Sequence, residues 1–293
     1  MKILVTGSTG QVGHELQHTL QGLGEVVAVD RRRMDLSNLQ QVRDVIREVR
    51  PGLIVNAAAY TAVDQAESER ELAMQLNAHA PATMAEEAKR LGAILIHFST
   101  DYVFDGSKDG RYDEQDPTSP VNVYGESKRE GELAIQAAGI PALIFRTQWV
   151  YGLYGKNFLL TMLRLAAQRD ELRVVNDQIG APTWARTLAE VTAEVVAQGR
   201  GQDLSWWMER AGLYHVTAQG ETSWCGFARR IVELSQLPRK PGVVGIPGSD
   251  YPTPAKRPAN SRLSCEKFMR TFCPLPQWDA ALERCMREQP PAV

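Results

Sequence analysis

The sequence has few of the features that mark membrane, secreted or metal-dependent proteins. Only four of its 293 residues are cysteines and none forms a C-x-x-C pair, so neither a zinc site nor a disulfide framework is indicated. The five histidines include no H-E-x-x-H motif. No apolar run approaches the roughly 18 residues of a membrane span, and the first one is too short for a signal peptide. Unpaired cysteines favour a reducing cytoplasm, and the lack of a membrane span argues against a membrane partner.

A strong charge of either sign is also missing. Thirty-three Lys and Arg residues stand against 35 Asp and Glu residues, which leaves a formal net charge of −2. Because non-specific nucleic-acid binding needs many clustered cationic contacts, this balance argues against a nucleic-acid partner. The chain is 43% hydrophobic and 23% charged, which is typical of a globular protein. Its length allows two lobes whose cores need no disulfide or metal.

Short apolar runs recur through the N-terminal half, at residues 2–6, 26–30, 53–56, 94–98 and 142–145. Continuous rather than alternating apolarity is typical of parallel strands that are buried on both faces. Stretches with the helical period lie between these runs. The pattern predicts an α/β fold with a Rossmann-like, doubly wound parallel sheet.

The alternation of strands and helices changes after about residue 147. We predict a dinucleotide-binding Rossmann domain over residues 1–147, with late sheet strands contributed by about 172–176 and 213–217. Residues 148–293 would form mainly a smaller, mixed α/β substrate lobe that is interleaved with the sheet. A Pro-rich and Gly-rich stretch at 237–258 is expected to be a long loop, and such loops are often functional.

A glycine-rich turn follows the first expected strand. Gly7, Gly10 and Gly13 are spaced as G-x-x-G-x-x-G, and Gln11 and Val12 open the helix-period stretch that follows. Glycines at such a turn let the backbone approach a pyrophosphate, and the helix N-terminus supplies free N–H groups to it. The spacing differs from the common G-x-G-x-x-G, so this turn alone is weak evidence for a dinucleotide site.

An acidic residue stands where a dinucleotide ribose is usually held. Asp30 ends the second expected strand, near the spacing of about 20 residues from the glycine turn that is typical of a ribose ligand. A carboxylate at this position favours NAD, whereas the neighbouring Arg31 suits the 2′-phosphate of NADP. We therefore expect NADPH or NADH, with the choice open. Ala57, after the third expected strand, is small enough to let a cofactor cross the sheet edge, although packing explains it equally well.

Residues 124–128 carry the strongest chemical signal. Tyr124 and Lys128 stand four residues apart, so on a helix they share one face. An ammonium group favours a nearby phenolate, and we expect Lys128 to lower the pKa of Tyr124 from its ordinary value of about 10. The Y-x-x-x-K pattern is common by chance, but Thr100 follows the fourth expected strand, at the sheet edge where ligands bind. Thr100 would hydrogen-bond the substrate carbonyl that Tyr124 protonates.

Together these residues resemble an extended short-chain dehydrogenase/reductase. More narrowly, the strings at residues 56–67, 99–106, 176–183 and 251–258 resemble the dTDP-4-dehydrorhamnose reductases, and the resemblance covers residues 2–278. It implies NAD(P)H-dependent reduction of the C4 keto group of dTDP-4-dehydro-6-deoxy-L-mannose to dTDP-L-rhamnose. This nucleotide sugar is a donor for cell-surface polysaccharide synthesis.

The resemblance also implies roles for individual residues. Tyr124 would donate the proton, Lys128 would hold the nicotinamide ribose, and Thr100 would orient the C4 carbonyl. The residues implied to line the cofactor, beyond those of the glycine turn, are Asp30, Asp35, Leu36, Ala59, Tyr60 and Thr61. The residues expected at the deoxysugar and its diphosphate are Asp101, Tyr102, Trp149 and Arg257. Asn77 is a weaker candidate, for an ordered water or a helix kink, and is left out of the predicted site.

Some proteins of this kind are described as dimers bridged by Mg²⁺ through glutamates. Glu15 is present here, but Arg186 stands where a partner glutamate would be expected. A cation at that position opposes a metal ion, so we predict no metal site. A monomer is favoured, and a dimer is the alternative.

Two other functions stay open. A nucleotide-sugar 4,6-dehydratase or 4-epimerase is the nearest alternative, but the dehydratases follow the catalytic Thr with Asp-Glu, whereas Tyr102 follows Asp101 here. An epimerase should also retain bound NAD through turnover. A non-catalytic regulatory subunit of the same fold is the second alternative. The intact set of Thr100, Tyr124 and Lys128 favours an enzyme, because a scaffold has no physical need for all three.

Overall fold

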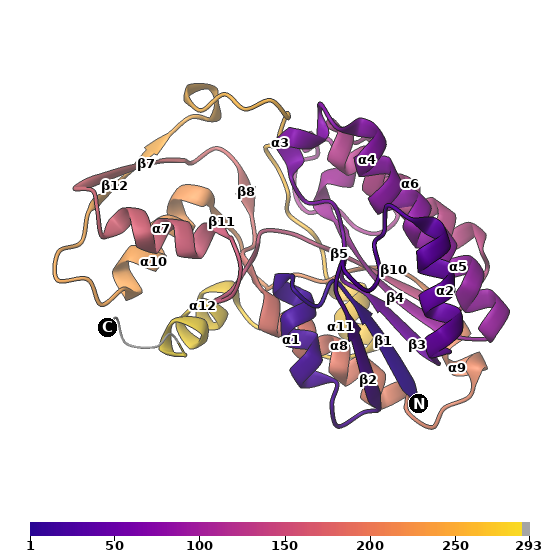
Figure 1. The fold of residues 1–293 in the computed structure, drawn as a ribbon. Coiled ribbons are helices and arrows are strands. Elements are labelled where there is room, and N and C mark those ends of the chain that lie inside the picture. Colours follow the sequence, from indigo (N-terminus) through magenta and orange to yellow (C-terminus); the bar gives the residue numbers. More distant parts are fainter. Residues whose placement is uncertain (289–293) are drawn as a thin grey trace.

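The computed structural model describes residues 1–288 and shows a larger lobe built on a parallel sheet beside a smaller lobe (Figure 1). The central sheet has six parallel strands. In sheet order these are β10 (Gly212–His215), β5 (Ala142–Thr147), β4 (Ile94–Thr100), β3 (Leu53–Asn56), β1 (Lys2–Thr6) and β2 (Glu25–Val29). The predicted Rossmann-like parallel sheet is therefore confirmed, and the five strands predicted in the first half of the chain are all present.

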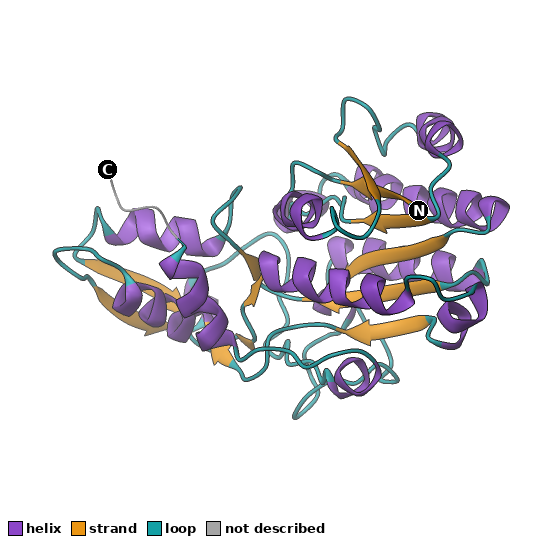
Figure 2. Cartoon of the chain, turned by 90° about the horizontal axis from the view of Figure 1, so that it is seen from below, coloured by secondary structure: helices purple, strands orange, loops and turns teal. Residues whose placement is uncertain are grey.

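Helices cover both faces of this sheet (Figure 2). One face carries α1 (Gln11–Thr19), α8 (Ala185–Gly199) and α11 (Glu266–Thr271), and the other carries α2 (Leu39–Val49), α5 (Ala80–Leu91) and α6 (Val123–Ala137). Neighbouring residues of a strand point to opposite faces, so Ile3 packs with the first group and Leu4 with the second. Burial on both faces explains why the strands are continuously apolar.

The smaller lobe has its own hydrophobic core. Its main elements are α7 (Phe158–Ala166), β7 (Glu171–Val175), α10 (Trp224–Leu234), β12 (Gly242–Ile246) and α12 (Trp278–Arg287). The prediction that residues 172–176 add a strand to the central sheet is wrong, because β7 pairs with β12 in a separate two-stranded sheet. Leu172 and Val174 are buried while Arg173 is exposed, an alternation that suits a strand covered on one face only. By contrast, the strand expected at 213–217 does join the central sheet, as β10 beside β5.

Short elements complete the chain and connect the two lobes. Two further strand pairs are β6 (Val150–Tyr151) with β9 (Thr183–Trp184), and β8 (Ile179–Gly180) with β11 (Thr222–Ser223). The remaining helical segments are α3 (Val63–Ala66), α4 (Arg70–Met74), the π-helix η1 (Gln75–His79), the 3-10 helices η2 (Asp101–Val103) and η3 (Gly248–Asp250), and α9 (Leu204–Glu209). The stretch expected to be a loop at 237–258 contains β12 and η3.

Residues 1–288 contain no helix that is both long enough and apolar enough to cross a membrane. The division into two domains at residue 147 stays a prediction, and the last five residues of the predicted 148–293 lobe lie outside the described part of the chain.

Candidate active site

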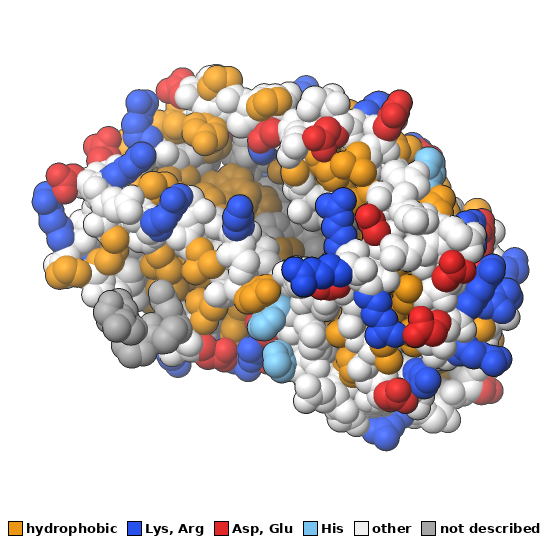
Figure 3. Space-filling model, in the orientation of Figure 1, with side chains coloured by type: hydrophobic (Ala, Val, Ile, Leu, Met, Phe, Trp, Pro, Cys, Tyr) orange, Lys and Arg blue, Asp and Glu red, His pale blue; other side chains and the backbone are white. Residues whose placement is uncertain are grey.

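A cavity of about 600 Å³ lies at the carboxyl ends of the central strands. Figure 3 shows the hollow between the two lobes, with hydrophobic side chains on its floor and Lys and Arg side chains at its rim. Every residue predicted to bind the cofactor lines this cavity except Gly13. The carboxyl edge of an open parallel sheet is where such folds bind ligands, so the structure gathers the predicted cofactor residues in one place.

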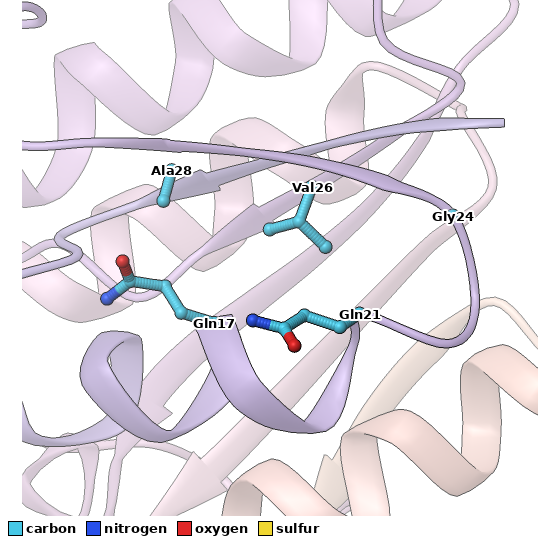
Figure 4. Close-up of a pocket in the computed structure, with 5 residues that line it drawn as sticks. All are labelled: Gln17, Gln21, Gly24, Val26 and Ala28. Atoms are coloured by element: carbon cyan, nitrogen blue, oxygen red, sulfur yellow. The ribbon is translucent and has the colours of Figure 1, made fainter.

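A second depression, of about 230 Å³, lies on the outer side of the sheet lobe. Figure 4 shows Gln17 and Gln21 facing Val26 and Ala28 of the edge strand β2. None of the described residues around it is charged or nucleophilic. The larger cavity is therefore the candidate active site.

The glycine turn brings the backbone close to the larger cavity. Gly7 has a φ of +68°, and a Cβ atom on it would lie 2.8 Å from the backbone of Ala58. A Cβ atom on Gly13 would overlap the Gly7 carbonyl oxygen, so Gly13 acts by letting α1 pack against the turn. Gly10 caps α1 without a side chain, which leaves N–H groups of the first turn for a ligand. This cradle fits the diphosphate of a dinucleotide.

Asp30 and Arg31, the two residues expected at the adenosine ribose, both line the cavity. Asp30 Oδ1 accepts hydrogen bonds from the backbone N–H groups of Arg32, at 3.0 Å, and Arg33, at 3.3 Å. The Arg31 side chain is 80% exposed, and its Nε lies 3.8 Å from Asp35 Oδ2. The site thus offers a carboxylate and a guanidinium side by side, and its geometry accommodates either dinucleotide.

Tyr124 and Lys128 lie on α6, whose N-terminus is capped by the Asn122 side chain through a 2.8 Å hydrogen bond from the Gly125 N–H. Burial raises the pKa of Tyr124 to about 12, although a hydrogen bond with Thr100 acts in the opposite direction. Burial also lowers the pKa of Lys128 to about 8. The lowered pKa predicted for Tyr124 is therefore wrong, because burial raises it instead. The Lys128 Nζ donates to the Phe98 carbonyl oxygen at 2.7 Å.

Thr100, Asp101 and Tyr102 stand together where β4 passes into η2. The Thr100 hydroxyl donates to Asp101 Oδ1 at 3.1 Å and accepts from the Tyr102 N–H at 3.2 Å. The Tyr102 ring meets the Tyr124 ring edge-on, with centroids 5.8 Å apart. Burial raises the pKa of Asp101 to about 7. Thr100 does not line the cavity itself, and it reaches the site through its contact with Tyr124.

The arrangement combines a glycine turn that fits a nucleotide with a partly buried tyrosine at the same cavity. Comparison with known proteins agrees with it. The sequence model of the family described as "RmlD substrate binding domain" matches residues 1–290. A dTDP-4-dehydrorhamnose reductase of Burkholderia thailandensis is 47% identical over 98% of this chain and 99% of its own length. The chain belongs to the family of dTDP-4-dehydrorhamnose reductases.

Two further members of this family show how close the similarity is. A dTDP-4-dehydrorhamnose reductase of Escherichia coli is 46% identical over 98% of this chain and 98% of its own length. A solved dTDP-4-dehydrorhamnose reductase of Bacillus anthracis, in complex with NADP, superimposes with a TM-score of 0.91 at 36% identity. That comparison covers 98% of this chain and 99% of the Bacillus protein.

In this reductase the predicted sugar-side residues do not line the cofactor cavity. Arg257 donates to both carboxylate oxygens of Asp64, at 3.0 and 2.8 Å, and lies beside Tyr102. Trp149 stacks on Trp224 of the smaller lobe, with ring centroids 3.7 Å apart. Its φ of +46° is unusual for a bulky residue, so its surroundings hold it in place. The structure thus groups Asp101, Tyr102 and Arg257, whereas Trp149 packs against the smaller lobe.

Several residues that line the cavity were not predicted from the sequence. Ser99 is the penultimate residue of β4 and Thr147 is the last residue of β5. Both line the cavity, and their buried hydroxyls have no hydrogen-bond partner among residues 1–288. Their positions at the carboxyl ends of strands could have predicted that they line a ligand site. Gly155 and Lys156 reach the cavity from the loop after β6, and no motif marked them. Buried hydroxyls without partners need polar atoms from elsewhere, so they support the fit of a polar ligand here.

Asn77 joins three segments next to the site. It lies in the π-helix η1 and is fully buried. Its Oδ1 accepts from the Tyr60 N–H at 2.8 Å, and its Nδ2 donates to the Tyr60 carbonyl oxygen at 3.0 Å and to Ser127 Oγ at 2.9 Å. Asn77 thus lies in a π-helical segment between α4 and α5, and the expectation of an ordered water or a helix kink stays a prediction. Its side chain holds the Tyr60 segment of the cavity wall against α6.

Proposed function

We propose that the chain reduces the C4 keto group of dTDP-4-dehydro-6-deoxy-L-mannose to give dTDP-L-rhamnose, with NADPH or NADH as the reductant. The observation that carries this proposal is the single cavity that joins the glycine turn to Tyr124 and Lys128. When bound, the nicotinamide supplies the hydride. Membership in the family of dTDP-4-dehydrorhamnose reductases supports the same reaction.

Tyr124 is the proton donor in this reaction. Its raised pKa of about 12 keeps the phenol protonated at neutral pH, which is the form that a reduction requires. Negative charge develops on the C4 oxygen during reduction, and a hydroxyl donor directed at that oxygen stabilises it. Thr100, through its contact with Tyr124, orients the phenol. Asp101, Tyr102 and Arg257 would meet the deoxysugar and its diphosphate, because Tyr102 lies between Tyr124 and Arg257 and a guanidinium suits a diphosphate.

The first turn of α1 would hold the cofactor diphosphate, while Asp30 and Arg31 would hold the adenosine ribose. Ser99 and Thr147 would offer their unpaired hydroxyls to polar groups of the cofactor. Lys128 would hold the nicotinamide ribose. Among these groups, the Ser99 and Thr147 hydroxyls have no hydrogen-bond partner in the described part of the chain.

Arg31→Ala tests the cofactor preference. A guanidinium recognises a 2′-phosphate, and the complex of the Bacillus relative with NADP supports this role. We expect the KM for NADPH to rise roughly tenfold, the effect of losing one exposed charge-assisted hydrogen bond, with the KM for NADH unchanged. Steady-state kinetics with each cofactor measure this. Arg32→Ala is the matched control, because Arg32 does not line the cavity. Equal changes for both cofactors in Arg31→Ala would contradict the assignment.

We propose that the enzyme needs no metal bridge and acts as a monomer. Arg186 forms an ion pair with Glu15 and lies 3.6 Å from Glu288, so the Glu15 carboxylate already has a cationic partner. A guanidinium at that place opposes a metal ion through charge repulsion. We expect the same turnover after dialysis against EDTA as with added Mg²⁺, and light scattering should give the mass of one chain. Loss of activity in EDTA that Mg²⁺ restores would overturn this proposal.

The four cysteines are all free thiols, and three of them are buried. Free thiols persist in a reducing compartment, so we place the enzyme in the cytoplasm. The balanced charge of the chain suits a small-molecule substrate better than a nucleic-acid partner.

The absorbance of the reduced nicotinamide tests the proposed reaction against its alternatives. Purified protein is mixed with dTDP-4-dehydro-6-deoxy-L-mannose and either NADPH or NADH. We expect oxidation of the cofactor that depends on the sugar. An epimerase would retain NAD and consume no added cofactor, and a regulatory subunit would show no turnover. No oxidation with either cofactor would rule the reductase out.

A further inference from the structure

An ion pair joins the wall of the cofactor cavity to the segment at residues 251–258. Asp64 lies in α3, two residues after Ala62, which lines the cavity. Asp64 Oδ1 and Oδ2 accept hydrogen bonds from Arg257 Nη1 and Nη2, at 3.0 and 2.8 Å. Oδ1 also accepts from the Ala255 N–H at 3.2 Å, so one carboxylate holds the backbone and a side chain of this segment. Figure 1 shows the segment after η3 passing beside α3.

This pair orients Arg257 more than it stabilises the fold. Hydrogen bonds from the Arg257 guanidinium lower the pKa of Asp64 from its ordinary value, so the carboxylate is ionised at neutral pH. The Asp64 side chain is 40% exposed and that of Arg257 is 24% exposed. Ion pairs that water reaches contribute little to the free energy of folding. Two parallel hydrogen bonds to one carboxylate, however, fix the plane of a guanidinium.

The contacts with Asp64 occupy one edge of the Arg257 guanidinium. This group has five N–H donors, two on each Nη atom and one on Nε. Nη1 donates to Asp64 and also contacts the Thr253 hydroxyl and, at 3.3 Å, the Ala255 carbonyl oxygen. Nη2 uses one hydrogen for Asp64. These contacts leave the Nε hydrogen and the second Nη2 hydrogen, which form the other two-donor edge of the planar group.

This second edge of Arg257 suits a diphosphate attached to the reacting sugar. A planar fork of two N–H donors matches two oxygens of a phosphate. Tyr102 lies beside Arg257, and its ring meets the Tyr124 ring edge-on. A nucleotide sugar whose C4 carbonyl lies at Tyr124 would then extend past Tyr102 to Arg257. Because Asp64 already restricts the Arg257 side chain, little further rotamer freedom is lost when a ligand binds.

We propose that Asp64 is a positioning residue of the substrate site, which holds Arg257 with its second edge directed at the diphosphate of the nucleotide sugar. Asp64 does not bind the ligand itself, because a carboxylate repels a phosphate. This inference rests on the role proposed for Arg257 in the reductase. The binding of a nucleoside diphosphate can nevertheless be measured without cofactor or turnover.

Asp64→Asn tests the positioning. Asparagine keeps an oxygen for the Ala255 N–H, but its NH₂ group meets Arg257 Nη2 with a donor in place of an acceptor. The guanidinium then loses its fixed plane, while the backbone contact stays. The substitution also removes a negative charge, so electrostatics alone would make a diphosphate bind more tightly. A positioning role predicts the opposite sign, because the fork is no longer held for the ligand.

Glu190→Gln is the matched control. Glu190, on α8, accepts two hydrogen bonds from Arg284 of α12, at 3.2 and 2.8 Å, and neither residue lines the cavity. The variant makes the same chemical change in another partly exposed ion pair. It should leave ligand binding unchanged.

Calorimetric titration with dTDP, in the absence of cofactor, measures the Kd. We expect the Kd to rise roughly tenfold in Asp64→Asn, which loses the ordered contact, and roughly 30-fold in Arg257→Met, which loses the guanidinium. The KM for dTDP-4-dehydro-6-deoxy-L-mannose should rise with the Kd, while kcat changes little. Thermal unfolding verifies that each variant is folded, and Arg257→Gln replaces Arg257→Met if that variant is not.

The double variant of Asp64→Asn and Arg257→Met separates positioning from a structural role. If Asp64 acts through Arg257, its substitution should not weaken dTDP binding further once the guanidinium is gone. A further loss in the double variant would assign the effect to the backbone at Ala255 and overturn the proposal. Unchanged or tighter dTDP binding in Asp64→Asn would overturn it as well, as would a wild type that does not bind dTDP. Cofactor oxidation by the wild type tests the proposed reductase function separately, so the failure of one can be told from the failure of the other.

Discussion

Tyr124→Phe is expected to lower kcat by about 100- to 10,000-fold, the usual contribution of a general acid. The substitution removes the hydroxyl that is hydrogen-bonded to Thr100 and leaves the ring that packs beside Tyr102. Without a proton donor, the charge that develops on the C4 oxygen is poorly stabilised. Because the glycine turn and the Asp30 segment are untouched, the Kd for the dinucleotide should change little. Stopped-flow turnover and a fluorescence titration with cofactor measure the two quantities separately.

Tyr102→Phe is the control for this prediction, since it removes a hydroxyl from the neighbouring ring. Tyr102 lies beside Arg257 on the predicted sugar side, so its loss should raise the KM for the nucleotide sugar more than it lowers kcat. Wild-type kcat in Tyr124→Phe would show that another group donates the proton. A kcat loss in Tyr102→Phe as large as in Tyr124→Phe would show that Tyr102 takes part in the proton transfer and does not only bind the sugar.

Gly125→Ala is expected to lower kcat by roughly 100-fold, because a shift of about 1 Å at a reacting group has an effect of this size. A Cβ atom on Gly125 would overlap the carbonyl oxygen of Tyr102. That oxygen belongs to the backbone, so α6 must move away from η2. The movement separates Tyr124 from Thr100, which the proposed mechanism requires to be in contact. Turnover measured well below the thermal unfolding temperature tests this prediction.

The control for the glycine substitution is Gly22→Ala. A Cβ atom on Gly22 would have no described heavy atom within 4 Å, and its φ is not in the left-handed region. This variant should keep wild-type turnover, whereas Gly125→Ala should also lose about 1–3 kcal/mol of unfolding free energy through overpacking. A fully active Gly125→Ala enzyme would show that the contact between α6 and η2 does not position Tyr124.

The fold of the first half could be predicted because its signals are local. Each of the five central strands in this half contains a short, continuously apolar run, as burial on both faces requires. The prediction for residues 172–176 was wrong because a short strand pattern does not identify the strand with which it pairs. Pairing of β7 with β12 joins segments about 70 residues apart, and nothing local to either strand indicates that contact.

The cofactor side of the site was predictable for a similar reason. Gly7, Asp30 and Tyr124 follow or lie near the ends of recognisable elements, and the carboxyl edge of the sheet brings them together. Contacts between distant side chains were not predictable. Arg257 pairs with Asp64 across 193 positions of sequence. His97 lies in an apolar strand, and the sequence gives no sign of its contact with Lys128. The pKa of Tyr124 was mispredicted because helical spacing shows a shared face but not how far the surrounding fold removes the phenol from water.

Transfer of deuterium from a reduced dinucleotide labelled at the transferring position tests the central claim most directly. The chain is incubated with the labelled cofactor and dTDP-4-dehydro-6-deoxy-L-mannose, and the sugar is analysed by mass spectrometry and proton nuclear magnetic resonance. The account predicts dTDP-L-rhamnose with one deuterium at C4 for each cofactor oxidised, and none with Tyr124→Phe over the same time. An unlabelled sugar that has only been isomerised or dehydrated, with the cofactor unconsumed, would contradict it.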